Sequence, residues 1–158
     1  TRLSRGLGDV YKRQLIGEDM NVESVGHIYQ QLSKNNLYLL DDVYHQDVVF
    51  EDSAHRLQGW QALQSYFDSL YTNVRRCDFD IKEHQQSGDS GFLTWSMSLE
   101  HPKLQKGKTV VVNGVSHLKF KDGKVIYHRD YFDLGEMLYE NLPLLGSVIK
   151  TIKQRLGQ

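Results

Sequence analysis

Residues 122–134 read DGKVIYHRDYFDL, a turn signal followed by an apolar and aromatic run that carries one carboxylate, Asp130, in its middle. Side chains of a strand point alternately to its two faces, which places His128, Asp130 and Phe132 together on one face. A carboxylate buried in a strand is costly unless it has a partner or a chemical role. The pattern therefore predicts that Asp130 lines a pocket and acts in proton transfer, with the imidazole of His128 beside it.

The same period of two extends backwards over most of the second half of the chain. Four runs follow it, at 76–85, 91–101, 107–120 and 124–132, and turn signals with Gly or Asp separate them at 87–89, 105–107 and 121–123. Connections this short join antiparallel neighbours. The sequence thus predicts a meander of four antiparallel strands.

The first half of the chain alternates helical and extended patterns. Apolar residues recur at helical spacing over 22–32, 37–43 and 60–70, and a short β-branched and aromatic strand stands at 48–50. After the last strand, Asp133 with Glu136 forms a helix-capping pair, and an amphipathic helix is predicted after Pro143. Helices followed by a strand meander indicate an α+β domain with the helices packed on one face of a curved sheet.

Composition limits the functions open to the chain. The formal net charge is −1, which lacks the basic excess that nucleic-acid binding needs, so we predict no nucleic-acid partner. The single cysteine, Cys77, allows no intramolecular disulfide and favours a reducing compartment. No apolar run has the length of a membrane span, so we predict a cytoplasmic protein without an integral membrane segment. The histidines lack metal-site spacing, and we predict neither a metal nor a cofactor.

The two ends of the chain differ from the middle. Residues 4–14, SRGLGDVYKRQ, resemble a translated sequencing adapter, and Met20 is then the natural start. We predict a non-native segment over 1–19, one domain over 20–146 and a C-terminal amphipathic helical tail over 147–158. Three roles are open to the tail: it covers the open end of the sheet, pairs with another subunit or touches a membrane surface. Its three cations give only marginal affinity for a membrane, which favours the first two roles.

A family resemblance rests on the order of these elements and on four segments: FED at 50–52, the helix after Gly59, DGKV with RDYFDL within 122–134, and LPL at 142–144. In these features the chain resembles the nuclear transport factor 2-like superfamily. It is most similar to the SnoaL-like branch, which includes polyketide cyclases and limonene-epoxide hydrolases, with ketosteroid isomerases as more distant relatives. The resemblance implies a homodimer and a cone-shaped α+β barrel, in which N-terminal helices pack on a strongly curved, mainly antiparallel sheet that encloses an apolar pocket.

The resemblance also implies roles for single residues. In the epoxide hydrolases the carboxylate that matches Asp130 belongs to an Asp-Arg-Asp set, whose other members should lie within 93–100. Alternation there places the apolar residues, among them Trp95 and Met97, on the inner face, so the Arg and the second Asp are missing. A lone carboxylate cannot act as base and acid in one step, which favours isomerisation or cyclisation over epoxide opening.

Ketosteroid isomerases offer a second comparison. Asp52 falls where those enzymes place the Asp that shuttles a proton, and Tyr29 falls near their oxyanion-binding Tyr after a one-residue gap. Ser116 aligns with their protonated acid. We therefore predict Asp130, Asp52 and His128 as catalytic residues. The structural alternatives are a strand-end turn for Asp52, a core position for Tyr29 and an aromatic spacer for His128.

The predicted substrate-binding residues are those expected to line the pocket: Tyr29, Phe50, Trp95, Met97, Ser116, Leu118 and Phe132. Such a wall suits a lipophilic small molecule. The first hypothesis is a cofactor-independent enzyme that moves a proton on this molecule, as an isomerase, cyclase or hydrolase. The alternative is a non-catalytic module of the same fold that binds a lipophilic ligand or another protein, because one fold hosts both kinds of function.

Overall fold

The computed structural model describes residues 19–156 of the 158-residue chain, and the segment over 4–14 that resembles an adapter lies outside them. The first elements are α2 (Val22–Gln31), the 3-10 helix η1 (Leu37–Asp41), β1 (Tyr44–Glu51), β2 (Arg56–Gln58) and α3 (Trp60–Asn73). A meander follows, formed by β3 (Arg76–Ser87), β4 (Ser90–Glu100), β5 (Val110–Lys121) and β6 (Lys124–Phe132). The last elements are α4 (Leu134–Met137), the 3-10 helix η3 (Tyr139–Asn141) and α5 (Leu145–Leu156).

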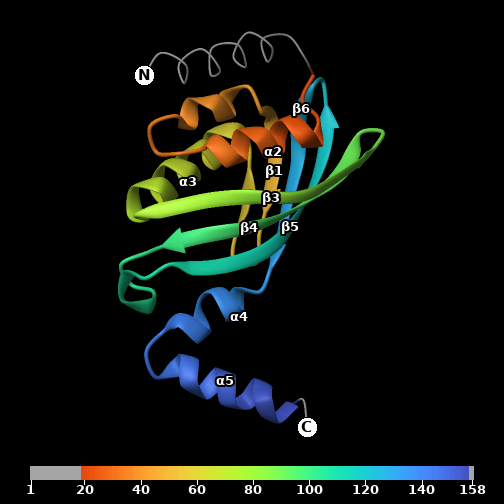
Figure 1. Ribbon diagram of the computed structural model, residues 1–158. Coiled ribbons are helices and arrows are strands. Elements are labelled where there is room, and N and C mark those ends of the chain that lie inside the picture. Colours follow the sequence, from red (N-terminus) through yellow and green to blue (C-terminus); the bar gives the residue numbers. More distant parts are fainter. Residues whose placement is uncertain (1–18, 157–158) are drawn as a thin grey trace, which may run out of the picture.

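Six strands form one open sheet in the order β2-β1-β6-β5-β4-β3 (Figure 1). Neighbours are antiparallel except β1 and β6, which run parallel. The predicted antiparallel meander is therefore confirmed. The turn between β5 and β6 shows how sequence directs it: Asp122 and Gly123 both have positive φ, 53° and 72°, as a two-residue type I′ hairpin requires.

Helices α2 and α3 cover the inner face of the sheet (Figure 1). A capping box begins α2, since the Asn21 side chain accepts the N–H of Ser24 and the Ser24 hydroxyl accepts the N–H of Asn21. Gly59 precedes α3 at φ 87°, a conformation that glycine adopts without strain. The two helices on the concave side of a bent sheet give the α+β cone that the sequence predicted.

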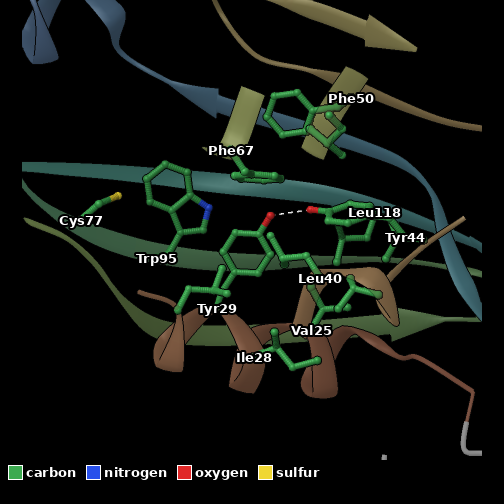
Figure 2. Packing of buried hydrophobic residues seen from close by; sticks show 14 of the residues in the cluster. Val25, Ile28, Tyr29, Leu40, Tyr44, Phe50, Phe67, Cys77, Trp95 and Leu118 are labelled. Atoms are coloured by element: carbon green, nitrogen blue, oxygen red, sulfur yellow. Dashed lines mark hydrogen bonds between the residues drawn. The ribbon is translucent and has the colours of Figure 1, made fainter. Parts of the chain in front are cut away.

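Aromatic rings fill the space between the helices and the sheet (Figure 2). Tyr29 of α2 packs edge-on against Phe67 of α3, with ring centroids 6.4 Å apart, and against Phe79 of β3 at 5.4 Å. Tyr44 of β1 stacks on Trp60 of α3 at 5.5 Å. These contacts fix both helices on the strands, so side chains from distant parts of the sequence meet at one place.

Two local features differ from the sequence prediction. The segment at 37–43 forms only the short 3-10 helix η1, and β1 begins at Tyr44 rather than near 48. Tyr44, Val48 and Phe50 are all buried, but the pairing of β1 with β6 shifts register between Tyr44 and Val49, which hides the start of the strand from a simple alternation. The three-residue strand β2 was not predicted, because so few residues carry no periodicity.

The chain leaves the sheet at Asp133, whose side chain accepts the N–H of Glu136 at 2.9 Å and caps α4, as predicted. The predicted amphipathic helix is α5, which extends away from the sheet in Figure 1. Lys153 of α5 forms ion pairs with Asp133 at 3.5 Å and Glu140 at 2.7 Å. Most apolar side chains of α5 are exposed, so this helix adds little to the core of the domain.

Candidate active site

A chain of buried hydrogen bonds runs from helix α2 to the carboxylate of Asp130 on β6. The Tyr29 and Tyr44 hydroxyls bond one another, as the dashed line in Figure 2 shows. The Tyr44 hydroxyl lies 2.8 Å from Nδ1 of His128, and Nε2 of His128 lies 2.7 Å from Oδ1 of Asp130. An ionised carboxylate only accepts, so Nε2 of His128 donates to it, and in the neutral imidazole Nδ1 then accepts from the Tyr44 hydroxyl. In this series of hydrogen bonds each donor therefore points toward Asp130.

A second arm reaches the same carboxylate from β4 and β5. The indole Nε1 of Trp95 donates to Oγ of Ser116 at 2.9 Å, and the Ser116 hydroxyl donates to Oδ1 of Asp130 at 2.5 Å. Gly114, the register partner of Trp95, makes this possible, because a Cβ at Gly114 would overlap the indole ring. The absence of a side chain at Gly114 thus allows Trp95 to lie against β5 and orient Ser116.

Both arms end on the same oxygen of Asp130, Oδ1. Oδ1 accepts from His128 and Ser116, whereas Oδ2 has no hydrogen-bond partner among residues 19–156. The Asp130 side chain is 18% exposed and borders the main cavity. Two donors on the same oxygen fix the orientation of the carboxyl group. The arrangement holds Asp130 in place and leaves Oδ2 able to accept a proton.

The tyrosines of this network stay protonated. Burial, followed by the neighbouring Tyr44, raises the pKa of Tyr29 well above its ordinary value. Burial also raises the pKa of Tyr44, and the charge of Asp130 adds to the effect, although the hydrogen bond from Tyr29 opposes it. Both side chains are therefore neutral hydroxyl donors at ordinary pH and fix the position of His128.

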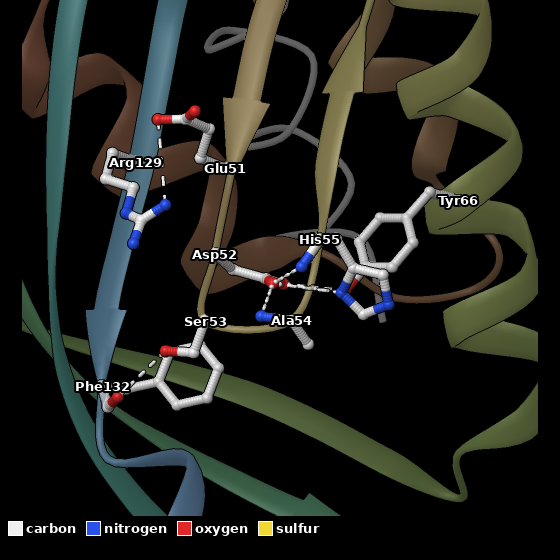
Figure 3. A network of polar contacts seen from close by, with 8 residues as sticks. All are labelled: Glu51, Asp52, Ser53, Ala54, His55, Tyr66, Arg129 and Phe132. Carbon is white, nitrogen blue, oxygen red and sulfur yellow. Dashed lines mark hydrogen bonds and ion pairs between the residues drawn. The ribbon is translucent and has the colours of Figure 1, made fainter.

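Asp52 occupies the turn after β1, in a separate cluster of polar groups (Figure 3). Its Oδ1 accepts the backbone N–H groups of Ala54 at 2.7 Å and His55 at 2.6 Å, and Nδ1 of His55 lies 3.1 Å from each carboxylate oxygen. The Tyr66 hydroxyl donates to Oδ2 at 3.4 Å. Asp52 is thus at once a wall of the cavity and the residue that closes the β1–β2 turn.

The main cavity has a volume of about 290 Å³ and is bounded mostly by apolar side chains. Its lining residues are Tyr29, Phe50, Asp52, Ala54, His55, Tyr66, Phe67, Leu70, Tyr71, Cys77, Phe79, Trp95, Met97, Leu99, Asp130, Phe132, Leu134, Met137 and Leu138. Neither lysine nor arginine is among them. The cavity therefore suits a lipophilic molecule that carries no negative charge.

Most predicted site residues gather around this cavity. Seven of them line it: Tyr29, Phe50, Asp52, Trp95, Met97, Asp130 and Phe132. Ser116 and His128 lie behind Asp130 and border a small adjoining void. Leu118 lines neither space, because it faces the helices at the far end of β5 and is fully buried in the core.

The sequence reasoning missed several residues of the site. Tyr44 was hidden by the unrecognised start of β1, although its alternation with Val48 and Phe50 was a usable signal. Tyr66 falls within the apolar helical pattern over 60–70, which predicts burial only, and no sequence pattern marks His55. Tyr71 belongs to the same helical face as Phe67, and this spacing indicated burial but not contact with the cavity.

Cys77 lines the cavity but is poorly suited to nucleophilic chemistry. Burial raises the pKa of its thiol to about 12, with a smaller increase from the charge of Asp78 and an opposing effect of Tyr71. The nucleophilic form of cysteine is the thiolate, which is scarce at neutral pH when the pKa is this high. Cys77 therefore acts in the cavity as a neutral, weakly polar side chain.

Neither a metal site nor a membrane span was found in the described part of the chain. Among residues 19–156, no group of three or more His, Cys, Asp or Glu side chains is arranged to hold a metal ion. No helix in the same range combines the length and the apolarity that crossing a bilayer requires.

Comparison with known proteins matches this geometry to a family. A family model described as the SnoaL-like domain matches residues 25–128, which include β1 and all of the meander up to His128. A search of curated proteins found no match. The matched segment ends two residues before Asp130, so the resemblance covers the cone and not the whole site.

Several solved structures share the fold. An LEH-like epoxide hydrolase of Mycobacterium tuberculosis is 18% identical, with a TM-score of 0.64 over 82% of this chain and 95% of that one. A putative SnoaL-like polyketide cyclase of Shewanella putrefaciens is 22% identical, with a TM-score of 0.61 over 75% and 95%. A Catenulispora acidiphila protein with a ketosteroid isomerase-like fold, in complex with trimethylamine, is 14% identical, with a TM-score of 0.65 over 77% and 92%. At these identities the likeness establishes the fold alone.

Proposed function

The chain belongs to the SnoaL-like domain family, and from that premise we propose that it is an enzyme that binds a lipophilic small molecule and moves a proton within it. Asp130 is the base of this reaction, and the reaction is an isomerisation or a cyclisation that needs no cofactor. His128, Ser116, Tyr44 and Tyr29 act as positioning residues.

One observation carries the proposal. Oδ1 of Asp130 is held by two donors, while Oδ2 is unpaired at the edge of an apolar cavity. A carboxylate oxygen that faces an apolar space is poorly hydrated, so little water competes with a substrate for it. In the reaction, Oδ2 removes a proton from one carbon of the substrate, and the resulting carboxylic acid returns it to another. Atoms and charge balance without a further reactant.

Epoxide opening fits this cavity less well. The inner face of β4 carries Leu93, Trp95 and Leu99, all of them buried, and no arginine lines the cavity. Arg129, the residue next to Asp130, points to the other face of the sheet, where its guanidinium lies 3.8 Å from Glu51 (Figure 3). The Asp-Arg-Asp set that the family resemblance implied for epoxide hydrolysis is therefore not assembled around Asp130.

The test uses a panel of bicyclic β,γ-unsaturated ketones, whose conversion to the conjugated isomers is followed by ultraviolet absorbance. Asp130→Asn keeps the size of the side chain but removes the base, and we expect kcat to fall about a hundredfold or more. Asp133→Asn is the matched control, because that carboxylate caps α4 and does not line the cavity. Turnover by Asp130→Asn at the wild-type rate would contradict the assignment.

The hydrogen bonds of Asp52 favour a second candidate function. Both of its oxygens are engaged by the turn, by His55 and by Tyr66, so the cavity offers no second free carboxylate. A site with one free acceptor also suits a carrier or sensor of lipophilic ligands. Chromatography with mass spectrometry of the bound ligand separates the two: the enzyme converts it to an isomer of equal mass and different retention time, and a carrier returns it unchanged.

We also propose that the chain forms a homodimer through the outer face of its sheet. Phe92 of β4 and Tyr131 of β6 lie on either side of β5 on this face, two register positions apart, and are 47% and 54% exposed. Val111, 55% exposed, lies further along β5. His117 stacks on Phe92, with ring centroids 4.4 Å apart, and extends the aromatic surface. Exposed aromatic residues in a contiguous group are typical of a protein interface.

A further inference from the structure

The hydroxyl of Tyr71 is a polar group without a partner inside the cavity. Tyr71 lies in the last turn of α3, is 5% exposed and lines the main cavity. Its hydroxyl makes no hydrogen bond with any residue from 19 to 156. A buried hydroxyl without a partner is unfavourable and is rare unless something else satisfies it.

The other hydroxyl and indole donors around the cavity are already in use. Tyr29 is bonded to Tyr44, Tyr66 donates to Asp52, and Trp95 donates to Ser116. Burial and the adjacent Cys77 raise the pKa of Tyr71, so its hydroxyl keeps the proton that it has to offer. The Cys77 thiol lies beside this hydroxyl and perturbs its pKa, but sulfur is a weak acceptor and the contact does not meet hydrogen-bond geometry, so the donor stays available to an oxygen.

The Cys77 thiol beside Tyr71 and the Ser116 hydroxyl that bonds Asp130 come from different levels of the sheet. Cys77 pairs in register with Leu99 of β4, whereas Ser116, which bonds Asp130, pairs with Leu93 of the same strand. Leu99 and Leu93 are six positions apart on β4. At about 3.3 Å per residue, this spacing corresponds to up to about 20 Å along the strand. Figure 2 shows Cys77 on the far side of Trp95 from the Tyr29–Tyr44 pair.

We propose that the Tyr71 hydroxyl is a binding subsite that donates a hydrogen bond to a neutral oxygen at the end of the ligand remote from Asp130. The substrate class is then an elongated lipophilic molecule with a ketone, ether or hydroxyl oxygen at one end and the reacting carbon at the other. A carboxylate is disfavoured at either end, because the cavity holds Asp52 and Asp130 and no lysine or arginine. This subsite rests on the proposed function only in that a lipophilic ligand occupies the cavity.

The test compares three probes of one shape: 2-acetylnaphthalene, 2-isopropylnaphthalene and 2-naphthoic acid. Isothermal titration with the full chain gives the ratio of the ketone and hydrocarbon dissociation constants for the wild type, for Tyr71→Phe and for Tyr139→Phe. We expect Tyr71→Phe to shift this ratio about fivefold against the ketone, the effect of one net hydrogen bond, while the hydrocarbon binds as before. The control Tyr139→Phe, outside the cavity, leaves the ratio unchanged. The acid binds most weakly to all three proteins.

Thermal unfolding without ligand supplies a second readout. Removing an unpaired buried hydroxyl does not destabilise the protein, so the melting temperature of Tyr71→Phe equals or exceeds that of the wild type. A clear fall would show that the hydroxyl has a partner within the protein and would overturn the proposal. An unchanged ratio of dissociation constants, or no binding of the ketone and the hydrocarbon by the wild type, would overturn it too.

The two proposals fail separately. If Asp130→Asn retains activity but the ratio shifts in Tyr71→Phe, the subsite stands and the assigned base is wrong. If Asp130→Asn is inactive and the ratio does not shift, the assigned base stands and the remote oxygen of the substrate binds elsewhere.

Discussion

Nε2 of His128 and Oδ1 of Asp130 are 2.7 Å apart although the two residues are separated by one position on β6. Both side chains point to the inner face, and the remaining ring nitrogen of His128 is occupied by the Tyr44 hydroxyl. The imidazole therefore has no free nitrogen with which to reach a ligand. Its role is to hold one oxygen of Asp130, so that the other keeps a constant position relative to the cavity.

Loss of the Tyr44 hydroxyl tests how far the fold depends on this network. Tyr44→Phe leaves Nδ1 of His128 and the Tyr29 hydroxyl unpaired in a fully buried place. We expect the free energy of unfolding to fall by about 1–3 kcal/mol, measured by urea titration. Tyr139→Phe, at an exposed position, is the matched control and should unfold like the wild type. Equal stability of both variants would mean that the network contributes nothing to folding.

Gly114 provides a test of the second arm. In Gly114→Ala the new methyl group overlaps the Trp95 ring, which has to move and release Ser116. Overpacking of this kind costs about 1–3 kcal/mol, and the displaced indole should change the tryptophan fluorescence of the folded protein. If the spectrum and the unfolding midpoint both match the wild type, Trp95 does not depend on the bare backbone at Gly114.

Stability is expected to decline at high pH. Burial raises the pKa of Tyr29, Tyr44 and Tyr71 above the ordinary value of 10.0, so the folded protein keeps protons that the unfolded chain loses. The stability that these groups contribute is complete below pH 10 and is lost as the pH rises above it, because only the unfolded state gains from ionisation. Urea midpoints measured between pH 8 and pH 11 should fall steadily over the upper part of this range, and less steeply in Tyr71→Phe. A constant midpoint would contradict the raised pKa values.

Cys77 gives a chemical measure of the same burial. A pKa of about 12 in the folded protein, against an ordinary value of 9.0, leaves about a thousandfold less thiolate at pH 8 than in the unfolded chain. Iodoacetamide should therefore label Cys77 very slowly at pH 8 and rapidly once urea unfolds the protein. Labelling can be followed by mass spectrometry, and rapid reaction of the native protein would show that the thiol is open to solvent.

The sequence predicts the part of the site that one strand carries by itself. Asp130 and His128 share a face because strand side chains alternate, and the β5–β6 turn is encoded by Asp122 and Gly123. The bond between Tyr44 and His128 joins residues 84 positions apart, and it depends on the parallel pairing of β1 with β6, which periodicity does not reveal.

Residue type alone also leaves open which polar groups are satisfied. Asp52 was predicted either as a base or as a turn residue, and the decisive information is the set of amide groups around its carboxylate. Tyr71 could be assigned to the buried face of α3 from its spacing. That its hydroxyl has no well-placed oxygen or nitrogen acceptor is a property of the packed structure and not of any sequence pattern.

The proposed homodimer makes the last prediction. Val115 lies on the outer face of β5, where its register partners are Thr94 of β4 and Tyr131 of β6. An arginine at this position would bury a charge in an apolar contact between subunits, so Val115→Arg should elute as a monomer in gel filtration with light scattering while the wild type elutes as a dimer. Gln61→Arg introduces the same charge on the exposed side of α3 and should leave the dimer intact. A wild type that is monomeric at high micromolar concentration, or a Val115→Arg variant that remains dimeric, would exclude this face as the interface.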